Sequence, residues 1–562
     1  MLIFASQYLM KKFYLFILLS GFCFEALGQS TYVPYSRDMY RIIDRFQVKY
    51  GEAENLLPTT FKPMRRSDLA RFLKNIESNY ENLSTQDRFN FEFLMNDNWQ
   101  WSNSTYNEND KSWWNLAYAK KSDFYFYQDK NVTVRVNPVL DVSLGKDSDL
   151  DETLFTNTRG IELEGTIDNK IGFYTFLTNT QALFPSYVTN YVRTKKAFPN
   201  EGFWKNDGDQ FDLTQARGYF TFGLTESIDV QAGYDKKFIG SGLRSMILSD
   251  FSNPFLFGQI NLRFKKFSYQ IFYGELISDI IFANNLSPGD GNYPKKYFNF
   301  HRLGVNITPK LEVGIFEAVI AQKADINYFN PIIFYRAVEQ QLGSPDNILL
   351  GLDFQWNFKK QFQFYGQFII DEFVIDALRA GDGDWRNKFG VQLGAKYYDA
   401  FNVPQLDLQL EANLARPFFY ASDTAVLSYT HYRNPLAHPL GANMKEIVFT
   451  AKYQPLPKLS VYAKIIRSRL GEDPNAGVSF GGDLLKSTDL RVANLGNTIG
   501  QGLSTNNTFV ELRGTYMLLH NVFLEWTNTY RDFKRVSGGI GSSPFITNVG
   551  LRWNIAKRHH EF

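Results

Sequence analysis

The sequence predicts an all-β transmembrane barrel of about 18 antiparallel strands, preceded by a small N-terminal α-helical segment. Three observations support this fold class. Most of the chain alternates apolar and polar residues with a period of two, the alternating segments pair through very short turns, and the opposite connections are long. A soluble sandwich also alternates, but so many regular hairpins with one-sided loop lengths are typical of an outer-membrane barrel.

The first 28 residues have the composition of a secretory signal peptide. Lys11 and Lys12 form a short basic region, residues 13–24 are apolar, and residues 26–28 provide a small-x-small cleavage site. Met10 is an alternative start. We therefore expect an exported protein.

Composition argues against several classes of function. The formal net charge of +2 gives no basic footprint for nucleic acid. The single cysteine, Cys23, lies in the predicted signal peptide, and the bulky Phe22 before it argues against a lipoprotein anchor. A mature chain would then have no disulfide and no thiol nucleophile. After residue 28 we find no apolar run of about 18 residues, so no spanning helix is predicted.

Residues 29–121 form a separate segment with helical periodicity. Ser36, Ser67 and Ser84 are the predicted N-caps of three short amphipathic helices. Asp87 stands three residues after Ser84, in a capping-box arrangement. We expect a small periplasmic bundle whose apolar stripes are packing surfaces.

Residues 122–562 are predicted to form the barrel. Eight hairpins turn at 168–170, 225–227, 265–266, 308–310, 359–361, between 397 and 406, at 454–458 and at 520–521. The long connections are 181–211, 239–255, 278–296, 321–346, 373–386, 417–443, 469–504 and 534–543, whereas 145–154 is brief. A first strand at 132–144 and a last strand at 545–555 are left to close on one another, which would pair every backbone group inside the lipid.

The first strand shows the expected orientation. Its valines should face lipid, while Arg135, Asn137 and Asp141 should face the lumen. Pro138 cannot donate to a ladder, so we expect a bulge or a missing pairing there. The short turns and both chain ends should lie in the periplasm, and the long loops outside the bacterial outer membrane.

Sugar sites need planar polar groups and aromatic faces, and the chain offers candidates of both kinds. The polar candidates are Asp235, Lys237, Arg244, Asp250, Arg336, Asp371 and Glu372, and the aromatic candidates are Tyr187, Trp204 and Tyr432. The alternative for the first four is a salt-bridge network in the lumen with a folded-in loop. For each aromatic residue, the alternative is an interfacial girdle or a loop core.

Enzyme chemistry is not predicted. The chain has six histidines and no HxxxH pair in a helical context, which argues against a zinc hydrolase. Asp371 and Glu372 could form an acid pair for glycoside hydrolysis, but neighbouring strand residues point to opposite faces. His559 and His560 lie in a basic tail that we expect to be solvated. No cofactor and no metal site are predicted.

Four stretches of the chain carry a family resemblance: GSGLRSMILSDFSNPFLFGQINLRF (240–264), YFNPIIFYRAVEQQLGSPDNILLGLDFQW (328–356), FYGQFIIDEF (364–373) and NPLAHPLGANMKEI (434–447). The first resembles the Wzi family of outer-membrane capsule-assembly proteins, and the other three resemble its broader branch with gliding-motility proteins of the RemB type. The resemblance implies an 18-stranded barrel with a periplasmic helical bundle. It also implies a surface lectin that holds capsular or extracellular polysaccharide.

The functional hypothesis is therefore a non-enzymatic barrel, monomeric in the outer-membrane lipid, that binds or anchors polysaccharide at the cell surface. One alternative is a diffusion channel for small polar solutes, because 18 strands leave room for an aqueous lumen. Another is an accessory of gliding motility or adhesion with a periplasmic or surface protein partner. An occluded lumen would argue against a diffusion channel and would favour polysaccharide binding.

Overall fold

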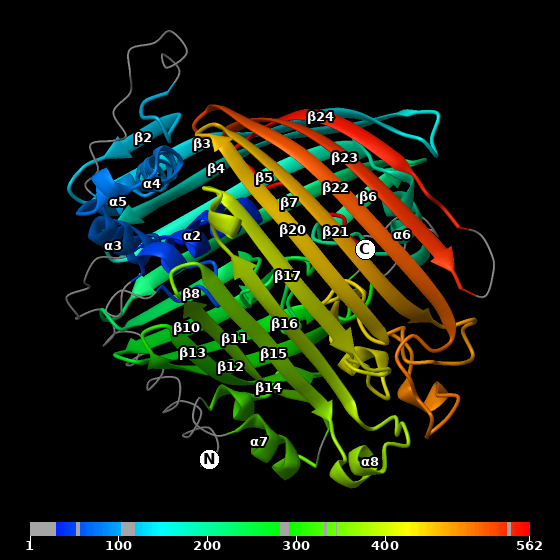
Figure 1. Cartoon of the computed structure of the whole chain (residues 1–562). Helices are drawn as coiled ribbons and strands as arrows, with labels where there is room; N and C mark the ends of the chain where they lie inside the picture. Colours follow the sequence, from blue (N-terminus) through cyan, green and yellow to red (C-terminus); the bar gives the residue numbers. More distant parts are fainter. Residues whose placement is uncertain are drawn as a thin grey trace, which may run out of the picture.

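The computed structural model describes residues 30–51, 57–102, 118–280, 292–330, 334–343, 345–536 and 541–562 (Figure 1). The predicted signal peptide, including Met10 and Cys23, lies outside the described residues. Among these residues, no helix has the length and apolar character needed to cross a membrane.

A closed antiparallel barrel of eighteen principal strands dominates the described part of the chain, as predicted. In chain order the strands are β3 (Val132–Asp147), β4 (Thr153–Ile167), β5 (Ile171–Leu183), β7 (Gln210–Gly223), β8 (Ile228–Asp235), β10 (Phe255–Phe264), β11 (Phe267–Ile277), β12 (Lys295–Thr308), β13 (Leu311–Ala321), β14 (Asn347–Phe358), β15 (Phe362–Glu372), β16 (Lys388–Tyr397), β17 (Leu406–Ala415), β20 (Met444–Leu456), β21 (Leu459–Glu472), β22 (Leu503–Leu519), β23 (Val522–Arg535) and β24 (Phe545–Trp553). Each strand pairs with its neighbours in this order, and β24 pairs with β3 to close the ring.

Short elements complete the architecture. The minor strands are β1 (Phe61–Lys62), β2 (Tyr125–Gln128), β6 (Phe203–Asp207), β9 (Phe238–Ile239), β18 (Thr430–His431) and β19 (Asn434–Pro435). The helices are α2 (Arg37–Tyr50), α3 (Arg66–Glu77), α4 (Thr85–Asp97), α5 (Trp99–Ser102), α6 (Ser186–Lys195), α7 (Tyr335–Gln341) and α8 (Ile375–Ala380). The 3₁₀ turns are η2 (Tyr80–Asn82), η4 (Ile326–Phe329), η5 (Ala400–Asn402), η6 (Ala425–Leu427) and η7 (Thr488–Leu490).

All eight predicted hairpins are confirmed, and their tight turns lie at one end of the barrel. In the β4–β5 turn, which has three residues between the paired Ile167 and Ile171, Asp168 and Asn169 both have φ near +50°, the left-handed conformation typical of tight hairpin turns. The distribution of side chains is the reverse of that in a soluble β-protein, with apolar residues outside and polar residues inside. Leu144, Phe220 and Leu352 on the outer face are at least half exposed, whereas polar side chains such as Gln231, Gln392 and Glu411 are buried in the interior.

Pro138 occupies a gap in the strand pairing, as predicted. On one side of β3, Pro138 pairs in register with Ile161 of β4. On the other side, β2 pairs with residues 133–136 and β24 with residues 140–147, so the described ladders leave 137–139 unpaired there. The Asn554 side chain donates to the Pro138 carbonyl at 2.8 Å. A residue without an N–H is thus placed where the ladder needs no donor.

The N-terminal helices share a small core and cover the turn end of the barrel (Figure 1). The Ser84 hydroxyl accepts from the Asp87 N–H at 3.1 Å, which confirms the predicted cap of α4. The predicted cap at Ser67 is wrong, because α3 already begins at Arg66. Residues 30 and 31 provide the reason: their oxygens accept hydrogen bonds from the N–H groups of Arg66 and Ser67 and replace a side-chain cap.

Candidate functional site

A loop between β8 and β10 folds into the barrel interior, and we call residues 236–254 the lumen loop. Glu411 on the wall accepts hydrogen bonds from the N–H groups of Leu243 and Arg244, at 2.7 and 3.1 Å. A Cβ at Gly242 would lie 2.8 Å from the Arg244 carbonyl oxygen and 2.4 Å from a Glu411 carboxylate oxygen, so the turn leaves little room for a larger residue. Gln367 accepts from the Met246 N–H at 2.7 Å. The loop is therefore fixed by polar groups of the wall.

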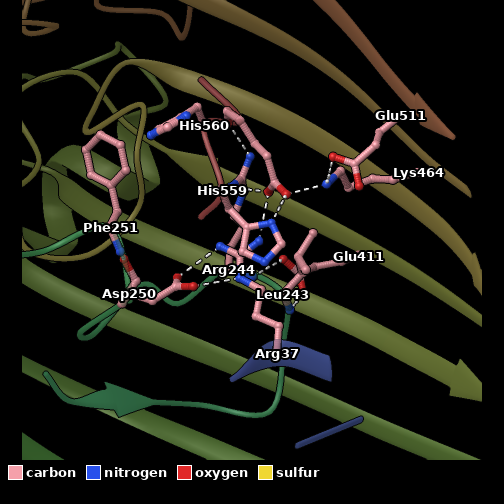
Figure 2. Close-up of polar contacts among 12 residues, drawn as sticks. Arg37, Leu243, Arg244, Asp250, Phe251, Glu411, Lys464, Glu511, His559 and His560 are labelled. Carbon is pink, nitrogen blue, oxygen red and sulfur yellow. Dashed lines mark hydrogen bonds and ion pairs between the residues drawn. The ribbon is translucent and has the colours of Figure 1, made fainter. Parts of the chain in front are cut away.

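Arg244 and Asp250, two of the predicted polar residues, belong to a salt-bridge network in the lumen, which was the alternative to a sugar site. Arg244 pairs with Glu446 of the wall and with Glu561, and Arg37 of α2 pairs with Asp250 and Glu561 (Figure 2). Burial alone would raise the pKa of Asp250, but the Arg37 guanidinium overrides this effect and holds that pKa below its usual range. These groups satisfy one another and join four distant segments of the chain: α2, the lumen loop, β20 and the residues after β24.

Residues 554–562, which we call the tail, run back into the lumen after β24. The prediction that His559 and His560 are solvated is wrong, because the His559 side chain is only 10% exposed and the His560 ring packs on Phe184 and Phe198. β24 ends at the turn side as expected, but Phe562 lies against Tyr191 of α6, with ring centroids 4.3 Å apart, at the loop end. Acidic groups of the interior explain this path: Arg558, for example, pairs with Asp141 and Glu201.

The helices, the lumen loop and the tail together occupy the barrel interior. Lys237 illustrates how this interior is packed: its ammonium donates to Gln231 at 2.6 Å and lies 4.0 Å from the centre of the Phe257 ring. Burial lowers the pKa of Lys237 to about 7. The strands thus enclose these segments, with cavities of about 180 and 70 Å³ left beside them.

A cavity of about 600 Å³ lies at the loop end of the barrel, and we call it the loop-end cavity. Its wall comes from α6, from segments 430–441 and 470–486, and from the loop ends of β22 and β23. Its aromatic lining residues are Tyr187, Tyr191, Phe533 and Phe562. Its charged lining residues are Lys195, Arg433, Lys486, Arg531, Arg535, Glu472, Asp473 and Asp483. Basic side chains therefore outnumber acidic ones.

Planar polar groups are available on the same wall. Asn507 is only 8% exposed, yet its side-chain oxygen accepts no hydrogen bond among the described residues. The Arg531 guanidinium lies about 5 Å from the ring centres of Tyr187 and Phe533 (5.0 and 4.9 Å). A buried acceptor without a partner is costly, so it is suited to an incoming hydroxyl.

Of the ten predicted site residues, the structure places Tyr187 in the wall of the loop-end cavity. Asp235 pairs with Arg217 at 3.0 Å in the lumen. Trp204 is 2% exposed in a loop core, and Tyr432 stands near Tyr293 in the turn between β18 and β19. Arg336 lies on α7 and pairs with Glu339.

Asp371 and Glu372 each have a partner within the fold. Asp371 accepts from the Tyr420 N–H at 2.9 Å, and Glu372 pairs with Lys388 at 3.1 Å. A register shift between Ile370 and Glu372 interrupts the expected alternation of faces at this point. No group of three potential metal ligands occurs in the part of the chain that the structure describes.

Asn507, Arg531 and Phe562 lie in the cavity wall but are not among the predicted site residues. Asn507 and Arg531 belong to strand segments whose alternation indicates a lumen face but no partner. Phe562 follows a basic stretch that reads as solvated. Their separation along the chain from Tyr187 leaves no local signal that would bring them together.

Comparison with known families decides the classification. The family model for the capsule assembly protein Wzi matches residues 84–530. The chain belongs to the Wzi family. The predicted resemblance is thereby confirmed, and the barrel of this Wzi-family protein lies in the bacterial outer membrane. The gliding-motility branch of the resemblance stays a prediction.

The solved structure of Escherichia coli Wzi shares this fold. Escherichia coli Wzi, described as an outer membrane protein involved in group 1 capsule assembly and a carbohydrate-binding β-barrel, has 11% sequence identity and a TM-score of 0.56 over 94% of this chain and 100% of that chain. Pseudomonas aeruginosa OprD has 12% identity and a TM-score of 0.40, over 76% of this chain and 96% of its own. Acinetobacter baumannii OccAB4 has 11% identity and a TM-score of 0.41, over 76% and 98%. No curated protein matches by sequence.

Proposed function

We propose that this Wzi-family protein binds an acidic extracellular polysaccharide in the loop-end cavity and anchors it to the cell surface without catalysis. The supporting observation is the cavity itself, which combines aromatic rings with planar polar groups at the loop end. Its volume of about 600 Å³ falls within the range of roughly 300–1,000 Å³ that is usual for ligand sites. Membership in the Wzi family and the carbohydrate-binding description of Escherichia coli Wzi support the same proposal.

The charge of the wall favours acidic sugars. Lys486 is paired with Asp473 at 3.0 Å, and Arg535 approaches Glu472 at 3.7 Å. Because the basic lining residues outnumber the acidic ones, the wall keeps an excess of positive charge. A chain of carboxylated sugars would complement this excess, whereas a neutral chain would gain only stacking and hydrogen bonds.

The packed interior disfavours the alternative of a diffusion channel. The Arg244–Glu561 and Arg37–Glu561 pairs hold the tail across the lumen, in the path that a solute would take. A role in motility or adhesion rests on the predicted branch alone, and recovery of a surface partner from crosslinked cells would support it.

Titration calorimetry of the purified protein tests the proposal, with alginate oligosaccharides as the acidic probe and dextran oligosaccharides as the neutral probe. We expect saturable binding of the acidic probe and at least tenfold weaker binding of the neutral one. Arg535→Ala should weaken acidic binding about tenfold, the equivalent of about 1.4 kcal/mol. Its neighbour Lys534 does not line the cavity, so Lys534→Ala is the matched control and should bind normally.

A second test measures the retention of surface polysaccharide by intact cells. Deletion of the gene should release surface polysaccharide into the medium, and the wild-type gene should restore its retention. Normal retention in the deletion strain, together with no saturable binding of either probe, would overturn the proposal.

A further inference from the structure

His301 and Glu317 form an ionisable pair on the outer face of the barrel, within the lipid-facing surface. His301 on β12 points outward, because its neighbours Phe300 and Arg302 point inward: Arg302 pairs with Asp353 in the lumen. The His301 ring nitrogen Nε2 lies 2.7 Å from Glu317 of β13, and the two residues are direct cross-strand neighbours.

On the neighbouring strands, the outward-facing residues level with this pair are apolar. The outward cross-strand neighbours, in order, are Val230, Ile260, Ile271, His301, Glu317, Leu350 and Ile370. All members except His301 and Glu317 are apolar. His301 lies seven residues from Thr308 at the turn end, which places it about 18 Å above that end for a strand tilted by about 40°. An apolar band about 25 Å tall would include this height.

A folded loop covers the pair. We call the described residues 322–330 and 334–343 the outer-wall loop; it contains η4 and α7, and α7 lies beside the outside of the wall (Figure 1). The Tyr335 ring stacks on His301 with centroids 4.1 Å apart and planes 8° apart. The N–H groups of Tyr335 and Arg336 donate to Glu317 at 2.7 and 3.4 Å. As a result His301 is only 7% and Glu317 only 2% exposed.

The covering loop buries Tyr328, Tyr335 and Val338 but leaves four other apolar side chains exposed. Ile326 is 72%, Phe329 54%, Phe334 60% and Leu342 38% exposed. Phe329 also stacks on the outward-facing Tyr273, with ring centroids 4.1 Å apart. On the neighbouring connection, Ile375 and Leu378 of α8 are 57% and 45% exposed.

The geometry points to the outer-wall loop as a membrane-inserted element whose partner is the acyl-chain region of the outer leaflet. Its exposed apolar side chains continue the lipid-facing surface formed by Leu350 and Leu352 of β14, which are 39% and 50% exposed. A buried ionisable pair in lipid is costly unless each group has partners. Glu317 therefore anchors the start of α7, and the loop in return shields Glu317 and His301 from the lipid.

Spin labels at single cysteines test the inference in phosphatidylcholine vesicles, with Cys23→Ser in every variant. Labels at Phe334→Cys and Ile326→Cys are compared with a lipid-belt control, Leu352→Cys, and an exposed loop control, Asn475→Cys. We expect both loop labels to be relaxed by oxygen and protected from a water-soluble nickel chelate, as at Leu352. Chelate accessibility equal to that at Asn475, or dipolar broadening that places a second copy on the loop, would overturn the inference.

Two substitutions of the anchor give a further readout. Glu317→Leu removes the acceptor for α7 and should raise the mobility and chelate accessibility of the Phe334→Cys label severalfold. Glu317→Gln keeps an oxygen acceptor and should retain most of the protection. Unchanged label spectra in Glu317→Leu would contradict the anchoring role.

Discussion

Arg244 and Glu446 form a bidentate ion pair inside the barrel, with the Arg244 Nε and Nη2 atoms 3.1 and 3.0 Å from the two carboxylate oxygens of Glu446. Both side chains are almost completely buried. A buried charge that loses its partner is strongly destabilising, so this pair fixes the lumen loop against the wall.

Glu446→Gln should destabilise the folded barrel by about 3 kcal/mol, because it removes one charge partner of a buried guanidinium. Urea unfolding of the protein in detergent micelles, followed by tryptophan fluorescence, measures the change. The matched control is Glu372→Gln, whose carboxylate is 44% exposed beside Lys388 and should cost less than about 1 kcal/mol. Equal shifts for the two variants would contradict the prediction.

Glu561→Lys should open the lumen. Glu561 is held by Arg37, Arg244 and Lys464, and a lysine there would place four positive charges together. Repulsion should expel the tail, so planar bilayers with the variant should show stable conductance where the wild type shows little. Asp489→Lys makes the same charge change at a 79% exposed site and should behave like the wild type.

Arg45→Met should loosen the helices at the turn end. The Arg45 guanidinium joins Asp87 of α4 at 3.0 Å and Asp399 of the β16–β17 turn at 2.7 Å, and it also contacts Asp407. Trypsin should cleave residues 37–97 of the variant at least tenfold faster than in the wild type.

Arg71→Met is the control for this experiment. Arg71 lies on α3 with its side chain 74% exposed and 3.9 Å from Asp68, so its loss should leave the cleavage rate nearly unchanged. Protection of the helices in Arg45→Met would show that apolar packing alone holds them.

Docking of segment 417–443 should weaken in acid through His431. The His431 Nδ1 atom accepts from the Ile277 N–H at 2.9 Å, and Nε2 lies 3.0 Å from the Pro254 carbonyl, to which it donates. Burial lowers the pKa of His431 to about 4, and the nearby Lys296 ammonium acts in the same direction. A proton on Nδ1 would replace the acceptor of the Ile277 N–H.

The sign of the pH effect follows from this lowered pKa. The stabilisation that neutral His431 gives to the docked segment is complete above the unfolded-state pKa of about 6.5. It is lost as the pH falls toward the folded-state pKa of about 4. A tenfold change in a protonation equilibrium corresponds to about 1.4 kcal/mol, so the loss amounts to roughly 3 kcal/mol. Proteolysis of 417–443 should accelerate between pH 6.5 and pH 4.5, and His431→Asn should remove most of this dependence.

The wall of the barrel was predictable because its determinants are local. Each hairpin joins neighbouring segments, so alternation and a short turn such as Asp168–Asn169 define it without distant information. The content of the lumen was not predictable in this way. Alternation shows that Glu446 and Lys464 face inward, but it does not show that Arg244 and Glu561, which are distant in sequence, meet them there.

The residues of the candidate site show the same difference between local signals and contacts made by distant segments. The aromatic content of its loop makes Tyr187 a predicted candidate, whereas Phe562 ends a basic tail predicted to be solvated, although both line the cavity. The error has a physical origin: Arg558 and His559 are polar by composition, and their burial depends on acidic partners such as Glu201 that approach only in the closed barrel.

The path of the tail imposes an order on assembly. β24 is the strand that meets β3, and the residues directly after it cross an interior whose turn end is covered by α2 and its neighbours. Threading a charged peptide past docked helices into a finished cylinder would require those helices to leave. The tail must therefore enter before the helices dock or before the β24–β3 seam is sealed, so the final step of biogenesis encloses an interior that has already been assembled.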